Sequence, residues 1–159
     1  SSAVIPAPTR PSATPPPTQA TRSIECINNE KDLSVAIRNY SKSNGNHFPP
    51  ATTWCDAIKP SVNSTKVFQC PAGNQIQVSH YAFNSRLDGK DITQVAPDTV
   101  MLFETTGGWN QSGGPELLLT EPRHYQYSGH SSGWVNVALV DGSVQRLTQS
   151  ELSTLRWDP

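Results

Sequence analysis

The clearest pattern of apolar and polar positions lies between residues 23 and 45, where apolar side chains recur at helical spacing. Ser23 is placed to cap the first turn of this helix, and Gly45 is placed to end it. Glu25 and Glu30 lie toward the positive end of the helix dipole. The pattern therefore predicts one long N-terminal helix with a single apolar face. Four side chains form that face: Cys26, Leu33, Ile37 and Tyr40.

A second, short helix and a series of short strands follow. The segment TTWCDAIKP, residues 52–60, predicts the short helix, which Pro60 ends. Beyond it, apolar runs or alternating apolar and polar residues predict strands. The strand segments are TKVFQCP (65–71), QIQVSHYAFN (75–84), DTVMLFET (98–105) and GWVNVALVDGSVQRLT (133–148).

The last of these segments is predicted to hold two strands joined at Asp141 and Gly142. An Asp-Gly pair between apolar runs indicates a hairpin, since a two-residue primed turn needs positive φ at both central positions. Residues 105–118 hold four glycines and are expected to form a long loop, and residues 150–159 to form one helical turn that packs back on the domain. One helix followed by antiparallel strands predicts an α+β fold.

Composition divides the chain into a Pro-rich start and one folded domain. Six of the 14 prolines lie in the first 22 of 159 residues, among Ser, Thr and Ala. Such a stretch cannot bury enough apolar surface to offset the entropy of ordering it. We expect residues 1–21 to form an extended linker or stalk and residues 22–159 to form the globular domain. The alternative for residues 1–21 is an ordered arm that lies along the domain.

Charge and hydropathy exclude two classes of partner. Twelve Lys and Arg against 13 Asp and Glu give a formal net charge of −1, without the basic surface that nucleic-acid binding requires. The longest apolar runs are four residues, as in Val137 to Val140. A membrane-spanning helix needs about 20 apolar residues. We therefore expect no nucleic acid as a partner and no membrane span in this chain.

Three cysteines, Cys26, Cys55 and Cys70, leave the cellular compartment open. None forms a Cys-x-x-Cys pair, so a zinc ribbon or a thioredoxin-type site has no support. One disulfide with one cysteine left over suits an exported protein, and three buried thiols suit a cytosolic one. Because the chain can double back between Cys55 and Cys70, we predict a disulfide between these two, with Cys26 free on the helix face. A bond between Cys26 and Cys70 is the rival pairing.

Catalytic and metal-binding patterns are sparse. The segment GHSSG, from Gly129 to Gly133, matches a nucleophile elbow, but a strand follows it and no acid and histidine follow in the required order. The histidines lack the spacing of a metal site. Asp88 and Asp91 are calcium candidates because their carboxylates lie close together, and the alternative is a solvated turn. Apart from this calcium candidate we expect no cofactor, and we expect no enzymatic activity.

Trp109 and Trp134 suggest an aromatic platform for a glycan or a peptide. Trp residues in so small a domain also fill the core or close loops. The sequence leaves both interpretations open.

Several motifs, in order along the chain, resemble those of one protein family. They run from CINNEKDLSVAIRNYSKSNGNHFPP (26–50) through WCDAI, VFQCPA, YAFNSRLDG, PDTVMLFET and PRH to GHSSGWVNVALVDGSVQ (129–145). Together they resemble the prepilin-type, pseudopilin-like proteins of type II secretion and type IV pilus systems. They are similar in particular to a bacterial subgroup with a C-terminal signature of His, nine residues, and Asp-Gly. The resemblance covers residues 26–147.

The histidine of this signature is either His130 or His124. Ten residues separate His130 from Asp141, one more than in the family, whereas His124 follows Arg123 as the family histidine follows an arginine. Members of the family begin with a cleaved leader and an apolar membrane helix, where this chain has its Pro-rich segment. Either the anchor has been removed, or the chain carries its domain on a stalk.

The resemblance implies a pilin-like fold, in which the long helix packs on an antiparallel sheet, and a non-catalytic role. The implied function is that of a structural or assembly subunit, or an accessory, of a type II secretion or type IV pilus-like filament. Its partners are then other pilin-like or secretion-system subunits, in the periplasm or at the cell surface of a diderm bacterium. In this view Asp141 and Gly142 fix the register of the terminal hairpin, and the histidine anchors the preceding loop. The alternative is a secreted or surface-attached module that binds glycan or peptide through the loops of Trp109 and Trp134.

Overall fold

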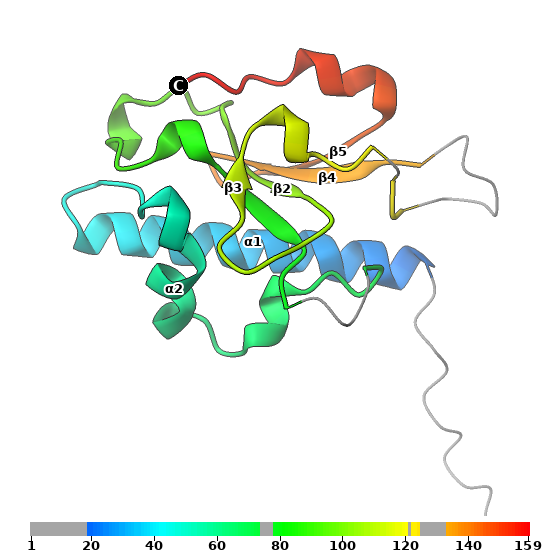
Figure 1. Ribbon diagram of the computed structural model, residues 1–159, viewed down its shortest axis with the longest axis horizontal. Helices are drawn as coiled ribbons and strands as arrows, with labels where there is room; N and C mark the ends of the chain where they lie inside the picture. The colour runs from blue at the N-terminus through cyan, green and yellow to red at the C-terminus, as the bar shows by residue number, and fades with distance from the viewer. Residues whose placement is uncertain (1–18, 74–77, 121, 125–132) are drawn as a thin grey trace, which may run out of the picture.

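The computed structural model describes residues 19–73, 78–120, 122–124 and 133–159. One long helix, α1 (Gln19–Ser43), lies along one face of a five-stranded sheet (Figure 1). This confirms the α+β class and the single long N-terminal helix. Most of the predicted linker lies outside the described residues, and its last three residues belong to α1.

Helix α1 begins four residues before Ser23, its predicted cap. Ser23 is buried, and its hydroxyl accepts a hydrogen bond from Trp134 Nε1 at 3.3 Å, so this side chain contacts the rest of the domain and does not cap the helix. The predicted end of the helix is confirmed. α1 stops at Ser43, and the chain then turns at Gly45 and Asn46 with φ of 64° and 66°. Glycine and asparagine adopt such angles more readily than other residues.

The sheet is mixed, whereas the sequence predicts an antiparallel one. It contains β1 (Tyr81–Asn84), β2 (Val100–Glu104), β3 (Ser112–Gly113), β4 (Val135–Leu139) and β5 (Val144–Leu147), in the order β3-β1-β2-β4-β5. Three pairs are antiparallel, but β3 runs parallel to β1. The cause is the Gly-rich segment 105–118, which carries the chain from β2 past β1 and adds a two-residue strand at the edge of the sheet.

The predicted hairpin of β4 and β5 is confirmed, but its turn is of another type. Gly142 has a φ of 90°, whereas Asp141 has no positive φ. Gly142 N donates to Leu139 O at 2.9 Å, and Leu139 N donates to Ser143 O at 2.8 Å. This pattern is a type I turn followed by a glycine bulge, in which the glycine alone needs positive φ. Asp141 Oδ1 accepts a hydrogen bond from Ser143 N at 2.9 Å and closes the turn.

One predicted strand is a helix. Within residues 65–71 the chain forms the 3₁₀ helix η3 (Thr65–Phe68), and the Ser64 hydroxyl accepts a hydrogen bond from Lys66 N at 3.2 Å. Such local bonds give the backbone an alternative to strand pairing, and a short apolar pattern does not distinguish the two. Of the predicted strand 75–84, residues 81–84 form β1, and residues 75–77 lie outside the described residues.

The predicted second helix is confirmed as α2 (Trp54–Ile58), which follows a 3₁₀ turn, η1 (Ala51–Thr53). Asn110 Oδ1 accepts hydrogen bonds from the backbone N–H groups of Cys55 at 2.8 Å and Asp56 at 3.2 Å. These are donors in the first turn of α2, which have no partner within the helix. The Gly-rich segment that contains Asn110 is thereby joined to α2.

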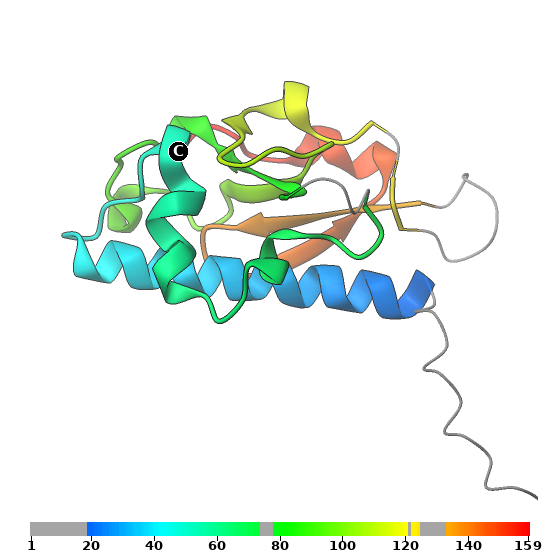
Figure 2. The same cartoon turned by 60° about the horizontal axis from the view of Figure 1, so that its bottom comes forward.

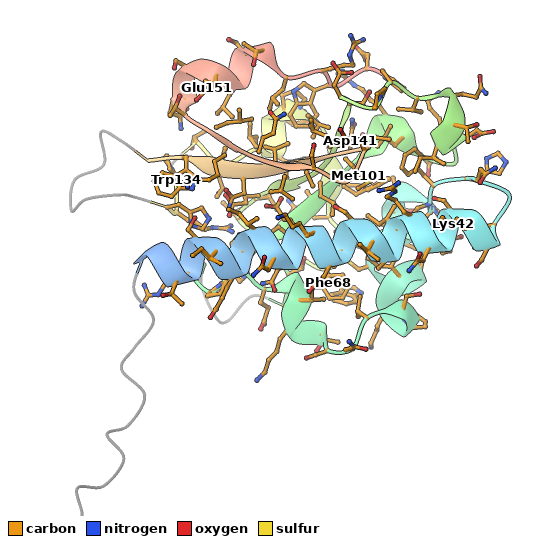
Figure 3. The ribbon with its side chains drawn as sticks, turned by 180° about the vertical axis from the view of Figure 1, so that it is seen from behind. Lys42, Phe68, Met101, Trp134, Asp141 and Glu151 are labelled. Atoms are coloured by element: carbon orange, nitrogen blue, oxygen red, sulfur yellow. The ribbon has the colours of Figure 1, made fainter. Side chains whose placement is uncertain are left out.

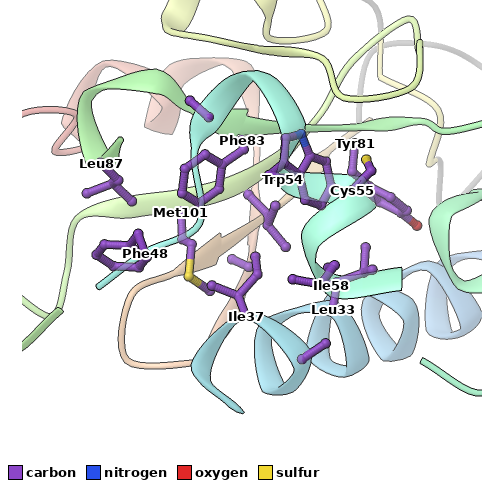
Figure 4. Close-up of a cluster of buried hydrophobic side chains, with 14 of the residues drawn as sticks. Leu33, Ile37, Phe48, Trp54, Cys55, Ile58, Tyr81, Phe83, Leu87 and Met101 are labelled. Atoms are coloured by element: carbon purple, nitrogen blue, oxygen red, sulfur yellow. The ribbon is translucent and has the colours of Figure 1, made fainter. Parts of the chain in front are cut away.

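Apolar side chains pack on both faces of the sheet. The larger core lies between the sheet and the helices α1 and α2 (Figures 2 and 4). The smaller core lies on the opposite face, where η8 (Gln149–Thr154) and Trp157 cover the sheet. Leu152 and Leu155 pack there with Trp157, so the predicted return of the last residues is confirmed. The larger core includes the fully buried side chains Phe48, Trp54, Phe68, Tyr81 and Phe83.

Helix α1 is the longest helix among the described residues, and exposed charged side chains such as Lys31 and Asp32 interrupt its apolar positions. Every helix among the residues that the structure describes is too short or too polar to cross a membrane.

Candidate functional site

Four side chains from distant parts of the chain meet in the interior of the domain. One comes from α1, one from the segment after η3, one from the end of β2 and one from the segment before β4. None has exposed surface, and their ligand atoms all lie within 4.8 Å of one another. The four residues are Cys26, Cys70, Glu104 and His124. We call them the buried cluster.

Glu104 Oε1 is the common acceptor of the buried cluster. It lies 2.7 Å from His124 Nε2, 2.9 Å from Cys26 Sγ and 3.7 Å from Cys70 Sγ. Cys70 Sγ is also 4.0 Å from His124 Nε2. The other carboxylate oxygen, Oε2, accepts a hydrogen bond from Asn136 N at 2.8 Å. One carboxylate thus binds an imidazole, two thiols and a backbone amide.

The register of the sheet places Glu104 against α1. In the antiparallel pair of β1 and β2, Glu104 is opposite Tyr81, and opposite residues project from the same face of a sheet. Tyr81 Oη lies 3.1 Å from Cys26 Sγ. The sheet therefore presents the Glu104 carboxylate and the Tyr81 hydroxyl side by side to the thiol of α1.

Backbone pairing and ring stacking hold His124 in place. Trp134 N donates to His124 O at 3.0 Å, in an isolated antiparallel bridge just before β4. The two rings stack with centroids 6.1 Å apart and an interplanar angle of 23°. Arg146 covers the Trp134 ring at 4.0 Å from its centroid. These contacts fix the imidazole with Nε2 toward Glu104.

A buried histidine outside the cluster positions Cys70. His80 Nδ1 accepts a hydrogen bond from Cys70 N at 2.9 Å, and His80 N donates to Phe68 O at 2.8 Å. A Cβ atom at Gly73 would lie 2.5 Å from the His80 ring. Glycine at that position therefore permits the chain after Cys70 to pass close to His80.

A second buried carboxyl group and a guanidinium lie next to the buried cluster. Glu30 of α1 has no exposed surface, and neither of its carboxyl oxygens has a hydrogen-bond partner among the described residues. Arg123 Nη2 donates to Thr105 O, and the Arg123 charge acts on both Glu30 and Glu104. A buried carboxyl group without a hydrogen-bond partner is costly, and protonation or a nearby cation lowers that cost.

Burial and proximity shift the pKa values of these groups. Burial opposes the protonation of His124, but its bonds with Cys70 and Glu104 outweigh this and raise its pKa to about 9. The hydrogen bond from Cys26 lowers the pKa of Cys70 to about 6, against the effect of burial. Burial raises the pKa of the Glu104 carboxyl, but the bond to His124 and nearby positive charges outweigh burial and lower it. Burial, then neighbouring groups, raises the pKa values of Cys26 and Glu30 well above their ordinary values.

The donor atoms of the buried cluster are those of transition-metal sites: two sulfurs, an imidazole nitrogen and a carboxylate oxygen. None of these four side chains has exposed surface, whereas a catalytic group must contact its substrate. A hollow of about 470 Å³ between α1 and η3 is lined by other residues, among them Asp32 and Val67. A structural role therefore suits the cluster better than a catalytic one.

The predicted disulfide between Cys55 and Cys70 is wrong. All three cysteines lie among the described residues, and no disulfide joins any two of them, so the rival bond between Cys26 and Cys70 is absent as well. Cys55 Sγ accepts a hydrogen bond from Asn110 N at 3.3 Å, and burial raises the pKa of Cys55 to about 12. η3 does return the chain to α2, where Phe68 packs on Trp54 with ring centroids 5.9 Å apart, but the Cys70 thiol beyond it faces Glu104 and not Cys55.

Asp88 lies in a turn and Asp91 pairs with His47 in an isolated bridge just beyond it, and the carboxylates of both bind neighbouring polypeptide groups. Asp88 Oδ1 accepts a hydrogen bond from Ala51 N at 2.7 Å. Asp91 Oδ1 accepts hydrogen bonds from Thr93 N at 2.8 Å and from Thr93 Oγ1 at 2.6 Å. These bonds give both carboxylates a structural role, and the calcium hypothesis stays a prediction.

Trp109 and Trp134 take part in packing contacts. Trp134 is 9 % exposed and stacks on His124. Trp109 packs on Phe68 with ring centroids 4.7 Å apart and donates its Nε1 hydrogen to Asp56 Oδ1 at 2.8 Å. These contacts favour a structural role for both rings, and a ligand platform stays a prediction.

His130, the other candidate for the signature histidine, lies outside the described residues, as do the first four residues of GHSSG. The structure therefore places one of the two candidates, His124, and it lies in the buried cluster. The other two signature residues, Asp141 and Gly142, form the hairpin turn.

Sequence reasoning names Cys26, Cys70 and His124 separately and does not bring them together. It does not single out Glu104 at all. Two signals were present: Glu104 ends an otherwise apolar strand, and Glu30 shares a helix face with Cys26. A carboxyl group at a core position requires a partner, so Glu104 and Glu30 could have been identified from the sequence as site candidates.

Comparison with known proteins gives no further assignment. No family model, curated protein or solved structure matches this chain. The function is therefore argued from the residues and from their arrangement.

Proposed function

We propose that this chain is a pilin-like structural or assembly subunit of a type II secretion or type IV pilus-like filament. Its partners are other pilin-like subunits, in the periplasm or at the cell surface of a diderm bacterium. The motifs in residues 26–147 that resemble this family support the proposal. The observation that carries it is the placement of α1. This 25-residue helix precedes the strands in the sequence and lies along one face of the sheet (Figure 2).

The first and last motifs of the resemblance lie in contact, which supports the same proposal. Arg38 of α1 donates from Nη1 to Asp141 O at 3.1 Å. Gly142 lies under the same side chain, since a Cβ atom there would be 2.9 Å from Arg38 Nη1. The hairpin turn thus holds the C-terminal half of α1 against the sheet, and the Asp-Gly pair has a structural role.

The outward face of α1 offers a surface to a neighbouring subunit. Ile24 and Val35 on this helix are 59 % and 56 % exposed. Val35 also lines the hollow between α1 and η3. Exposed apolar side chains beside a hollow are typical of protein–protein contacts. We infer that another pilin-like subunit, or a second copy of this chain, contacts this face.

The alternative, a surface module that binds glycan or peptide through Trp109 and Trp134, has less support. Trp134 is nearly buried, and both rings make packing contacts within the domain. The binding module therefore ranks second.

The gene sequence upstream of this chain separates the two functions. A leader that ends in Gly and is followed by an apolar helix is expected for a filament subunit. A plain signal peptide directly before the Pro-rich segment would contradict the filament role and favour the secreted binder.

Site-specific crosslinking tests the contact surface directly. A photo-crosslinking residue at Val35, in cells that contain the host's secretion or pilus system, should yield adducts with pilin-like subunits or with a second copy of this chain. Val78 is the matched control, because it is 55 % exposed but lies outside α1, just before β1. Equal adducts at both positions, or no pilin-like adduct from Val35 or Ile24, would contradict the proposal.

A further inference from the structure

The buried cluster of Cys26, Cys70, Glu104 and His124 has the donor atoms and the spacing of a metal site. Four of the six distances between its ligand atoms run from 2.7 Å, for His124 Nε2 to Glu104 Oε1, up to 4.0 Å, for Cys70 Sγ to His124 Nε2, and all six lie within 4.8 Å. A tetrahedral zinc site, with bonds of about 2.0 to 2.3 Å, has ligand atoms about 3.3 to 3.8 Å apart. The observed contacts fall on both sides of this range, so small side-chain shifts complete the geometry.

The neighbourhood of the cluster has an excess of acidic groups. Glu30 and Glu104 share this interior with two thiols, and neither oxygen of Glu30 has a hydrogen-bond partner among the described residues. Two thiolates, one carboxylate and a neutral imidazole carry three negative charges. A divalent cation reduces these to one, and the Arg123 guanidinium, whose charge acts on Glu104, offsets the remainder. A dication therefore balances the charge of this buried site.

We propose that Cys26, Cys70, Glu104 and His124 bind one zinc ion in a closed site with four protein ligands. Calcium and magnesium take oxygen ligands, so the two sulfurs disfavour both. Four protein ligands without an open position are typical of structural zinc, whereas catalytic zinc keeps a position for water or substrate. The ion displaces the protons of the thiols and of the imidazole, and metal bonds replace the hydrogen bonds at Glu104 Oε1.

The zinc ion joins segments that are far apart in the sequence. Along the chain Glu104 is 78 residues from Cys26, 34 from Cys70 and 20 from His124. The ion therefore fixes the N-terminal half of α1 to the sheet and to the segments before β1 and β4. This inference does not depend on the filament role, since a zinc-linked domain can serve either proposed function.

Metal analysis of the whole chain tests the proposal. The protein, purified under reducing conditions without chelator, should contain about one zinc per chain when its metal content is measured by inductively coupled plasma mass spectrometry. After removal of the zinc, titration with Co²⁺ should produce thiolate-to-cobalt charge transfer in the near ultraviolet and intense visible bands of tetrahedral cobalt. Zinc should abolish these bands and raise the thermal midpoint of the metal-free protein.

Two variants separate the cluster from the other cysteine. Cys70→Ser should lose the zinc and weaken the charge-transfer band. Cys55→Ser is the matched control: Cys55 is also fully buried, but its Sγ accepts a hydrogen bond from Asn110 N outside the cluster. It should keep the zinc and the cobalt spectrum of the unmodified protein. Circular dichroism of each variant shows whether it is folded.

The measurements on the unmodified chain decide the proposal even if Cys70→Ser does not fold. Folded, reduced protein that neither retains zinc nor gives a cobalt charge-transfer band would overturn it. So would a Cys55→Ser variant that is folded but loses the metal, or a mapped disulfide between Cys26 and Cys70 in protein isolated from its native compartment.

Discussion

The two halves of α1 are buried against the sheet through different chemistry. In the N-terminal half the buried face carries Ser23, Cys26 and Glu30, whereas in the C-terminal half it carries mainly apolar side chains, Leu33 and Ile37 among them. The two buried serines of that half, Ser34 and Ser41, donate their hydroxyl hydrogens to carbonyl oxygens of the helix itself. The spacing of these buried positions is that of one helix face along the whole stretch. The residue types therefore change along the helix while the geometry of burial does not.

Each half of α1 has its own partner (Figure 3). Trp134, beside the N-terminal half, binds Ser23 and stacks on His124 of the buried cluster. Asp141, beside the C-terminal half, accepts a hydrogen bond from Arg38. The comparison teaches that periodicity determines which helix positions are buried, and that buried polar residues whose side chains the helix itself does not bind indicate a site on the opposing elements.

The largest expected effect on stability comes from the C-terminal half of α1, which we call the apolar half; its N-terminal half is the polar half. Leu33→Ala should destabilise the protein by about 3 kcal/mol, because it removes a fully buried side chain from the larger core and leaves a cavity (Figure 4). The midpoint of urea denaturation measures this loss. If the two halves are chemically separate, the folded variant should keep its zinc. A Leu33→Ala variant that is folded but has lost the metal would show that the two halves are not separate.

Much of the fold could be predicted because its signals are local. The spacing of Leu33 and Ile37 and the stop at Gly45 predict α1, and the apolar runs beside Gly142 predict β4 and β5. The prediction of a strand at residues 65–71 is wrong because Ser64 caps a 3₁₀ helix there. The prediction of an antiparallel sheet fails at β3 for another reason. The path of a long loop brings two residues into parallel pairing with β1, and no local sequence pattern encodes that path.

The candidate site could not be predicted, because its members share no local spacing. Cys70 and Glu104 come together only after β1 and β2 pair and η3 turns the chain toward α1. Metal motifs are recognised in sequence when ligands lie a few residues apart, and here the smallest separation from Glu104 is the 20 residues to His124. The buried cluster follows from topology.

The second prediction concerns the hairpin turn between β4 and β5, which contacts the apolar half of α1 through Arg38. Gly142→Val should cost about 1 to 3 kcal/mol, because a β-branched residue is strained at a φ of 90°. Gly142→Asn is the control, since it adds the same Cβ atom next to Arg38 but tolerates positive φ better. Denaturation midpoints compare the two. Equal losses would assign the effect to contact with Arg38 and not to the backbone angle.

The smallest effect concerns the polar half, where Glu30 is buried and its pKa is raised well above the ordinary value, first by burial and then by the charge of Glu104. In the unfolded chain a glutamic acid loses its proton above a pH of about 4.3. The stability that Glu30 contributes is therefore fully present below that pH, and it is lost as the pH rises through the raised value of the folded state.

Glu30→Gln removes this pH dependence, because an amide has no proton to lose. In zinc-free protein, the variant should gain stability relative to the unmodified chain as the pH rises from 5 to 8, because only the unmodified chain has a buried proton to lose. Urea midpoints at the two pH values measure the gain. Glu25→Gln is the control on the same helix, since Glu25 is exposed and water already solvates its carboxylate. A gain that is equal for both variants, or larger at pH 5, would show that the carboxyl group of Glu30 is not held protonated by its surroundings. The polar half of α1 would then differ from the apolar half in residue type alone, without the energetic consequence that burial of an acid should have.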